Sequence, residues 1–186
     1  MVRLFFQHAG TKEGSRHFTQ SLARRRTVEE LQPYFEKDLG PDGGRRLLNA
    51  LDSRFPAGFN CWGIPVGGGM VFDRLDVGDI VLFIGKVQLV PYPDGNFEYA
   101  GRVKLKWPDP LHWTSQYIWD EARWPYMFFF DAVDISLPWP RFLDDVGYSE
   151  TLNPRGWFQP VHPNRYRQLP GGSPEAYLQH VVRHHP

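Results

Sequence analysis

The chain has 186 residues, of which 41% are hydrophobic and 16% aromatic, and it contains 7 Trp, 17 Pro and 18 Gly. This length suits a single domain over residues 1–186, and the many rings and turn residues favour short strands over a helical bundle. Lys and Arg balance Asp and Glu at 21 each. This balance excludes a strong general affinity for polyanions, so any nucleic-acid surface must be local.

Cysteine usage and hydropathy narrow the class of protein further. The single Cys excludes a disulfide framework and a Cys-based zinc site, and it agrees with a reducing compartment. Residues 1–6 lack the apolar core of a signal peptide, and no apolar run reaches membrane-spanning length. We therefore expect a cytoplasmic protein with no membrane partner.

The first third of the chain predicts one strand and two helices. Residues 3–7 form the predicted strand, and a polar loop is expected at 11–16. Thr27 and the Glu three residues later have the spacing of a capping box, which predicts a helix that runs to about Lys37. A second short helix is expected from Asp42, with an apolar side formed by Leu47, Leu48 and Leu51.

The stretch 59–85 carries the most informative pattern. Trp62 stands between two small residues, ahead of a glycine-rich loop at 67–69 where the backbone could approach a flat group. A Gly-Asp turn then leads into residues 80–84, which are apolar at every position. This pattern predicts a strand that is covered on both faces.

The rest of the chain predicts two more strands and a long loop. Apolar residues or Gly alternate with polar ones over 99–107, and residues 126–135 are almost continuously apolar. Residues 137–142 end the second strand and begin a short helix, and Ser173 begins a final helix. Residues 108–125 show little periodicity and are expected to form a functional loop that carries Trp113, Trp119 and Trp124.

Two groups of basic residues are candidates for contact with a nucleic-acid backbone. The first is the triplet Arg24, Arg25 and Arg26, and the second is the ladder on the polar face of strand 99–107, formed by Arg102, Lys104 and Lys106. Either group could contact phosphates. Each could equally be solvated surface, because short basic runs and wet strand faces are both common.

The sequence contains no recognisable catalytic or cofactor motif. The glycines at 67–69 lack the Lys-Ser or Lys-Thr that a P-loop requires. His180 and His184 have helical spacing, but no Glu follows the first His as in a metalloprotease helix. Cys61 has no adjacent base, and we expect it to pack as a small side chain. We therefore predict no catalytic residue, metal or cofactor, and favour a binding module over an enzyme.

The sequence resembles the EVE and YTH branch of PUA-like domains. The resemblance begins with the Trp62-Gly63 step, the strand at 80–84 after its Gly-Asp turn, and the Gly-containing alternating strand that follows. It continues in segments similar to the amino-terminal domains of McrB-type and HNH-fused modification-dependent restriction enzymes: Trp119, 126–130, 135–138, 143–148, 156–161 and 164–166. The resemblance covers roughly 59–166. It implies an α+β fold, a PUA-like twisted β-barrel with flanking short helices.

The resemblance also implies a function. In such domains a Trp forms one wall of a cage that holds a modified base, so this chain would bind double-stranded DNA with methylated adenine or methylated or hydroxymethylated cytosine. It would serve as the specificity module of a type IV restriction system, with a motor or nuclease on another domain or subunit. Trp62 would be the first wall and Trp119 the second. The other implied contacts are Trp113 or Trp124 as a third ring, and Asn60, the Gly63 backbone, Gln7 and His8 as polar groups.

Three alternatives stay open from the sequence. The domain could read N6-methyladenine in RNA, or it could bind or process a small nucleoside-type ligand on a PUA-like fold. Binding of a free methylated nucleoside as tightly as a duplex would favour the small ligand. Trp62 itself could be a core residue with a satisfied N–H group rather than a cage wall.

Overall fold

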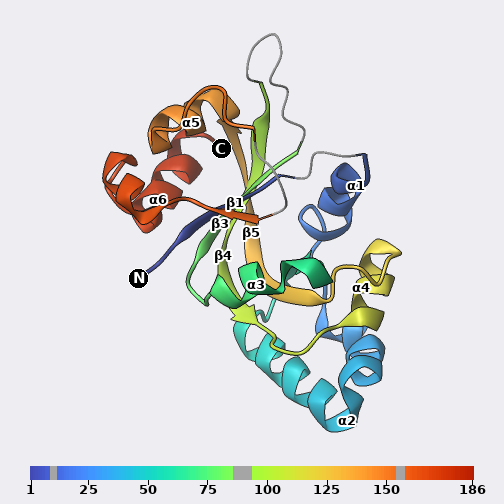
Figure 1. Ribbon diagram of the computed structural model, residues 1–186. Helices are drawn as coiled ribbons and strands as arrows, with labels where there is room; N and C mark the ends of the chain where they lie inside the picture. The colour runs from blue at the N-terminus through green and yellow to red at the C-terminus, as the bar shows by residue number, and fades with distance from the viewer. Residues whose placement is uncertain (9–11, 86–93, 154–157) are drawn as a thin grey trace. The chain divides into compact units, whose positions relative to one another are not determined.

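The computed structural model describes residues 1–8, 12–85, 94–153 and 158–186 (Figure 1). It has the predicted α+β composition, with six strands and several short helices. Contacts divide the chain into two compact units. Unit 1 comprises Met1–Arg16, Gly78–Arg102 and Val133–Pro186, and unit 2 comprises His17–Val77 and Val103–Ala132. The strands β4 (Asn96–Lys106) and β5 (Tyr126–Pro138) each contribute residues to both units, and the single domain stays a prediction.

The sheet of unit 1 is built around a fully buried strand. β3 (Ile80–Ile84) pairs in parallel with β1 (Leu4–His8) and antiparallel with β4, and β1 also pairs with β6 (Phe158–Pro160). Every residue of β3 is buried, as the continuous apolar run predicted. With the end of β5 included, the strand order in this unit is β5-β4-β3-β1-β6.

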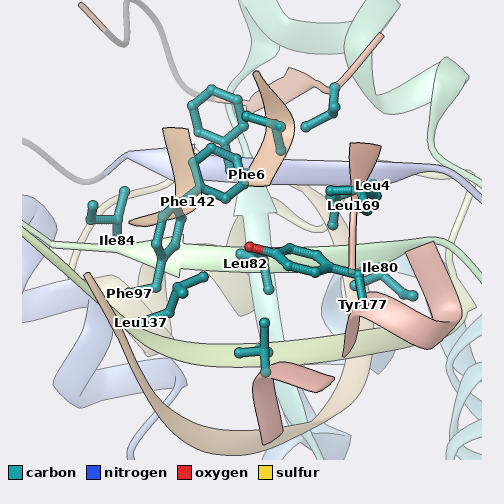
Figure 2. Packing of buried hydrophobic residues seen from close by; sticks show 14 of the residues in the cluster. Leu4, Phe6, Ile80, Leu82, Ile84, Phe97, Leu137, Phe142, Leu169 and Tyr177 are labelled. Carbon is teal, nitrogen blue, oxygen red and sulfur yellow. The ribbon is translucent and has the colours of Figure 1, made fainter. Parts of the chain in front are cut away.

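Helices complete the core of unit 1. They are α5 (Trp139–Val146), the 3₁₀ helix η2 (Pro163–Gln168) and α6 (Pro174–His184). Figure 2 shows Phe6, Phe97 and Phe142 gathered at one end of this core and Tyr177 at the other. Ser173 accepts a hydrogen bond from the Ala176 amide at 3.2 Å, which confirms the predicted start of the last helix.

Unit 2 holds a second core, in which strands run in the order β2-β5-β4. β2 (Asn60–Ile64) is buried throughout and pairs antiparallel with β5. The helices that lie wholly in this unit are α2 (Val28–Arg54), α3 (Gly69–Arg74) and α4 (His112–Trp119), together with the 3₁₀ turn η1 (Val66–Gly68). The end of α1 (Lys12–Ser21) also belongs to it. The glycines at 67–69 thus end η1 and begin α3 instead of forming an open loop.

The two helices predicted after Thr27 are both present, as the two parts of α2 on either side of a kink. Thr27 caps it by accepting from the Glu30 amide at 3.4 Å, as predicted. The helix breaks at Gly40, whose φ of 71° and ψ of 171° are not helical. Glycine can adopt this conformation without a Cβ clash, and the proline that follows it disfavours helical geometry at the residue before it.

Two predicted loops are in fact helical. Residues 12–16 begin α1, and 112–119 form α4. Local sequence gives α4 no N-terminal cap, and Asp38 of α2 supplies one by accepting from the amides of Trp113 at 2.8 Å and Thr114 at 2.9 Å. Such a cap provides acceptors for backbone N–H groups at the start of the helix, which have no partner within the helix. Because Asp38 is 75 residues away in sequence, the residues around α4 give no sign of this cap.

Candidate nucleic-acid interface

Three of the four predicted cage tryptophans meet in unit 2. Trp62 from β2, Trp119 from the end of α4 and Trp124 before β5 surround the imidazole of His17. The His17 ring centroid lies 6.5 Å from Trp62, 6.1 Å from Trp119 and 5.3 Å from Trp124. With Phe18, whose ring is 5.7 Å from Trp62, these residues form what we call the aromatic cluster.

The aromatic cluster is tightly packed. Trp62 is 6% exposed and Trp119 is 1% exposed, and the Trp119 indole N–H donates to the Ser21 hydroxyl. A Cβ added to Gly63 would lie 2.5 Å from the Trp124 carbonyl oxygen, so the close approach of β2 requires glycine here. The predicted rings are therefore brought together, but His17 occupies the position between them.

Other residues predicted to contact the base are Trp113, Gln7, His8 and the Gly63 backbone, of which Gly63 packs against Trp124 of the aromatic cluster. Trp113, at the opposite end of α4, is 47% exposed, and the Lys37 ammonium lies 3.2 Å from its ring centroid. Gln7 and His8 belong to unit 1, where the Gln7 amide donates to the His8 carbonyl at 2.9 Å. Burial lowers the pKa of His8. The Gly63 backbone belongs to β2, opposite Met127 of β5.

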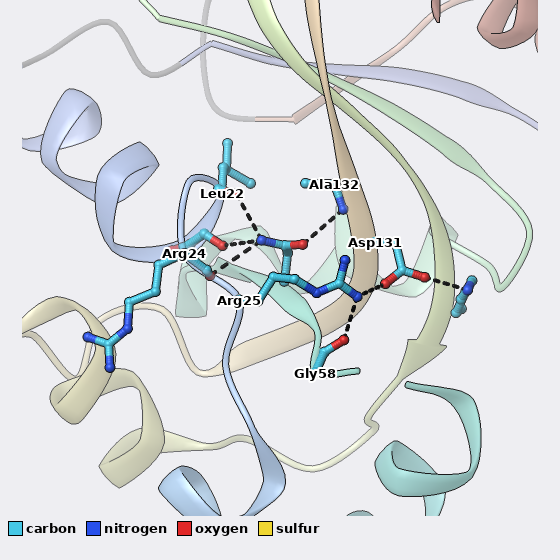
Figure 3. A network of polar contacts seen from close by, with 9 residues as sticks. Leu22, Arg24, Arg25, Gly58, Asp131 and Ala132 are labelled. Carbon is cyan, nitrogen blue, oxygen red and sulfur yellow. Dashed lines mark hydrogen bonds and ion pairs between the residues drawn. The ribbon is translucent and has the colours of Figure 1, made fainter. Parts of the chain in front are cut away.

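The Asn60 side chain forms hydrogen bonds with several backbone groups, among them those of Leu22, Arg24 and Ala132, which Figure 3 labels. Its amide nitrogen donates to the carbonyls of Ser21, Leu22 and Arg24 at 3.1, 2.8 and 3.3 Å, and its oxygen accepts from the Ala132 amide at 2.9 Å. This use of the whole amide differs from the predicted contact with a base. Asn60 instead fixes the segment between α1 and α2 against β5.

Most of the basic residues predicted to contact a backbone have partners within unit 2. Arg25 bonds to the Gly58 carbonyl at 2.6 Å and pairs with Asp131, which also pairs with Lys104. The Arg26 side chain is 4% exposed, and it pairs with Glu30 and donates to the Gln20 carbonyl at 2.7 Å. The tasks of Arg25 and Arg26 are thus largely structural.

Two of the basic residues predicted to contact a backbone are exposed, and their side chains have fewer internal partners than those of Arg25 and Arg26 among the described residues. The Arg24 side chain is 58% exposed, and among the described residues its one ion pair is with the Glu30 carboxylate, at 2.9 Å. Arg102, in unit 1, is exposed and forms no ion pair within the described ranges. Lys106 is intermediate, because its ammonium donates to the Leu75 carbonyl at 2.9 Å and lies 4.5 Å from the Phe72 ring centroid.

A pocket of about 350 Å³ opens beside Arg24 and Arg26, and sequence reasoning missed it. We call it the Tyr117 pocket; it is lined by Thr19, Gln20, Arg24, Arg26, Tyr117 and Ile118. Its lining residues come from α1, α4 and the loop after α1, and α4 and the start of α1 had been predicted as loops. The signals in the sequence were the aromatic residues within 108–125 and the basic triplet that contains Arg24 and Arg26.

The walls of the Tyr117 pocket are held in place. The Tyr117 ring stacks on Tyr34 with centroids 4.1 Å apart, and its hydroxyl donates to Glu30 at 3.2 Å. Burial and the Glu30 carboxylate raise the pKa of Tyr117. The side-chain oxygen of Gln20 is buried and accepts no hydrogen bond from any described residue.

Cys61 lies in β2, and its burial raises the pKa of the thiol to about 12. We predict that the folded protein resists a thiol reagent at pH 8, because only about 1 in 10⁴ molecules would carry the reactive thiolate. A thiol titration with and without denaturant checks this. One fast-reacting thiol in the native protein would contradict it.

No group of three or more His, Cys, Asp or Glu that could hold a metal ion occurs within the described ranges. His180 and His184 are ring neighbours, with centroids 4.6 Å apart, and burial together with the charge of His184 lowers the pKa of His180. In the part of the chain that the structure describes, no helix is both long and apolar enough to cross a bilayer.

No family model and no curated protein matches the chain. Among solved structures, the fold is similar to the N-terminal domain of Thermococcus gammatolerans McrB bound to m5C DNA. The TM-score is 0.65, and the alignment covers 89% of this chain and 94% of that one at 19% sequence identity. The predicted likeness to a McrB-type amino-terminal domain is therefore confirmed at the level of fold.

Proposed function

We propose that this chain binds double-stranded DNA that contains a modified base and takes that base out of the helix. The observation that carries the proposal is the fold, shared over nearly the whole chain with a domain described as bound to m5C DNA. The PUA-like assignment of EVE and YTH type belongs to the same proposal. Fold alone does not specify function, so the residues of unit 2 must supply a physical route to recognition.

Base extrusion is the route that the chemistry requires. A modified base inside a duplex is stacked on both faces, and a protein can reach its full outline only after extrusion. A methyl group adds only about 0.8 kcal/mol of apolar burial, so discrimination needs a shaped pocket and polar groups that read the rest of the base. In our proposal Trp62, Trp119 and Trp124 contribute the aromatic framework of this site.

Backbone contacts would come from a few local cations. The chain has no net charge, so phosphate contacts must come from individual residues. We propose that Arg24 and Arg102 provide them, because these two side chains have the fewest internal partners among the predicted basic residues, as far as the described ranges show. Lys104, Lys106, Arg25 and Arg26 could join only by giving up internal partners. The domain would act as a specificity module, with any motor or nuclease on another domain or subunit.

The test is a binding panel of duplexes that are identical except for one base. The panel should contain 5-methylcytosine, 5-hydroxymethylcytosine, N6-methyladenine and their unmodified parents, each titrated at several salt concentrations. We expect one modified duplex to bind at least about tenfold more tightly, a difference of about 1.4 kcal/mol. Binding to unmodified DNA should be weak and fall steeply with salt, as phosphate contacts require. Equal affinity for all duplexes would refute the proposal.

The same panel separates the alternative functions. A free methylated nucleoside that competes as well as the duplex would identify a small-ligand domain, for which the size of the Tyr117 pocket is also suitable. A single-stranded RNA with N6-methyladenine that binds more tightly than every duplex would identify an RNA reader.

A further inference from the structure

We infer that the Tyr117 pocket receives the extruded base, and that the side-chain oxygen of Gln20 accepts an N–H from the exocyclic amino group of that base. This inference rests on the proposed function and names the class of base: cytosine-type or adenine-type, which carry an amino group, and not uracil-type. Nothing in the sequence pattern singled out this pocket. The tryptophan cage predicted from the family resemblance lies in the aromatic cluster instead.

The packing of unit 2 favours the pocket over the aromatic cluster as the place for a base. Between the three indoles the space is already filled by His17, and a base could enter only if α1 moved. The Tyr117 pocket is open, and its volume of about 350 Å³ is at the lower end of the range for small-ligand sites. The aromatic cluster supports the walls of the pocket, because the hydrogen bond from the Trp119 indole to the Ser21 hydroxyl connects α4 to α1.

The side chains that line the pocket can contact the flat faces of a base as well as its polar edges. Tyr117 presents ring surface beside the buried Ile118, and the stacking of Tyr117 on Tyr34 orders the ring before any ligand arrives. An ordered wall reduces the entropy lost on binding. Tyr117 is 38% exposed, so a base would cover surface that now faces solvent.

The polar groups define which bases fit. The Gln20 oxygen is a buried acceptor without a donor among the described residues, which is a costly arrangement unless a ligand supplies the N–H. Arg24 keeps donors beyond those that face Glu30, and Thr19 adds an exposed hydroxyl. An acceptor beside donors matches the edge of cytosine or adenine, where an amino group neighbours a ring nitrogen.

The charge of the pocket fits a base that is attached to a phosphate backbone. Arg24 and Arg26 both face the single carboxylate of Glu30, so the group keeps one net positive charge. Arg26 is buried and pairs with Glu30 inside the protein, whereas Arg24 lies at the surface, where a flanking phosphate could reach it. A wholly acidic or neutral lining would not favour an extruded nucleotide in this way.

Four variants of the full chain test the inference. Thr19→Trp fills the pocket from an exposed position, and Gln20→Leu removes the acceptor with little change in size. Gln20→Glu restores an acceptor at the same position, and Arg45→Ala removes an exposed cation that does not line the pocket. Each is titrated with duplexes containing 5-methylcytosine, N6-methyladenine or 5-hydroxymethyluracil, with 2-aminopurine next to the target base to report its unstacking. Thermal unfolding of each variant verifies the fold.

We expect wild type and Arg45→Ala to prefer an amino-bearing modified base and to raise the 2-aminopurine signal. Thr19→Trp and Gln20→Leu should lose roughly tenfold of this preference, as expected for an unpaired hydrogen-bonding group, and Gln20→Glu should recover most of it. If wild type discriminates and both pocket variants discriminate equally well, the pocket assignment is wrong while the proposed function stands. If wild type prefers 5-hydroxymethyluracil, the class of base is wrong. If wild type shows no preference, the proposed function itself fails.

Discussion

Replacement of Trp62 by Ala is expected to lower the free energy of unfolding by roughly 3–5 kcal/mol, the range for truncating a large buried ring. Trp62 is 6% exposed and lies against Phe18 and His17, so its removal leaves a cavity that the strand β2 cannot close. A ring that lined an open cage would cost much less. The expected loss is therefore a direct measure of how closed the aromatic cluster is.

Trp113→Ala is the matched control, because it removes the same side chain from a position that is 47% exposed. We expect it to cost less than about 1 kcal/mol, as most surface substitutions do. Urea unfolding of both variants measures the difference, and thermal unfolding should show about 2–4 °C per kcal/mol in a chain of this size. Affinity for modified and unmodified duplex is measured on the same samples. A stable Trp62→Ala protein that has lost its preference for the modified duplex would place Trp62 in an open base cage.

Asn60→Asp is expected to be as damaging as a deletion in the core, although it preserves the shape of the side chain. The Asn60 amide donates to three carbonyls, and Asp would turn these donors into an oxygen that repels them. A buried carboxylate without a cation, or a neutral acid with one donor left, should each cost about 3 kcal/mol or more. The segment that carries Arg24 would lose its anchor.

The exposed Asn49 of α2 provides the comparison, since Asn49→Asp makes the same chemical change where water solvates the carboxylate. Chemical denaturation at pH 7 should separate the two variants by at least about 2 kcal/mol. The Asn60→Asp protein should also regain part of its stability at lower pH, where protonation removes the buried charge. Equal stability of the two variants would show that the hydrogen bonds of Asn60 contribute little.

The sequence by itself determined the features that depend on local pattern. A short apolar run that follows a turn predicts a strand covered on both faces, and β3 is that strand. The caps at Thr27 and Ser173 depend on an oxygen and an amide two or three residues apart, so they were predictable. Cys61 was expected to be packed, and it is buried.

Only the tertiary structure decided the composition of the candidate site. The helix α4 depends on the distant Asp38, and Asn60 gathers three carbonyls from a segment about 40 residues away. The acceptor on Gln20 becomes significant because α1 and α4 enclose it beside Tyr117. Burial and hydrogen-bond satisfaction are properties of segments brought together in space, and no periodicity or spacing in one segment encodes what the other supplies.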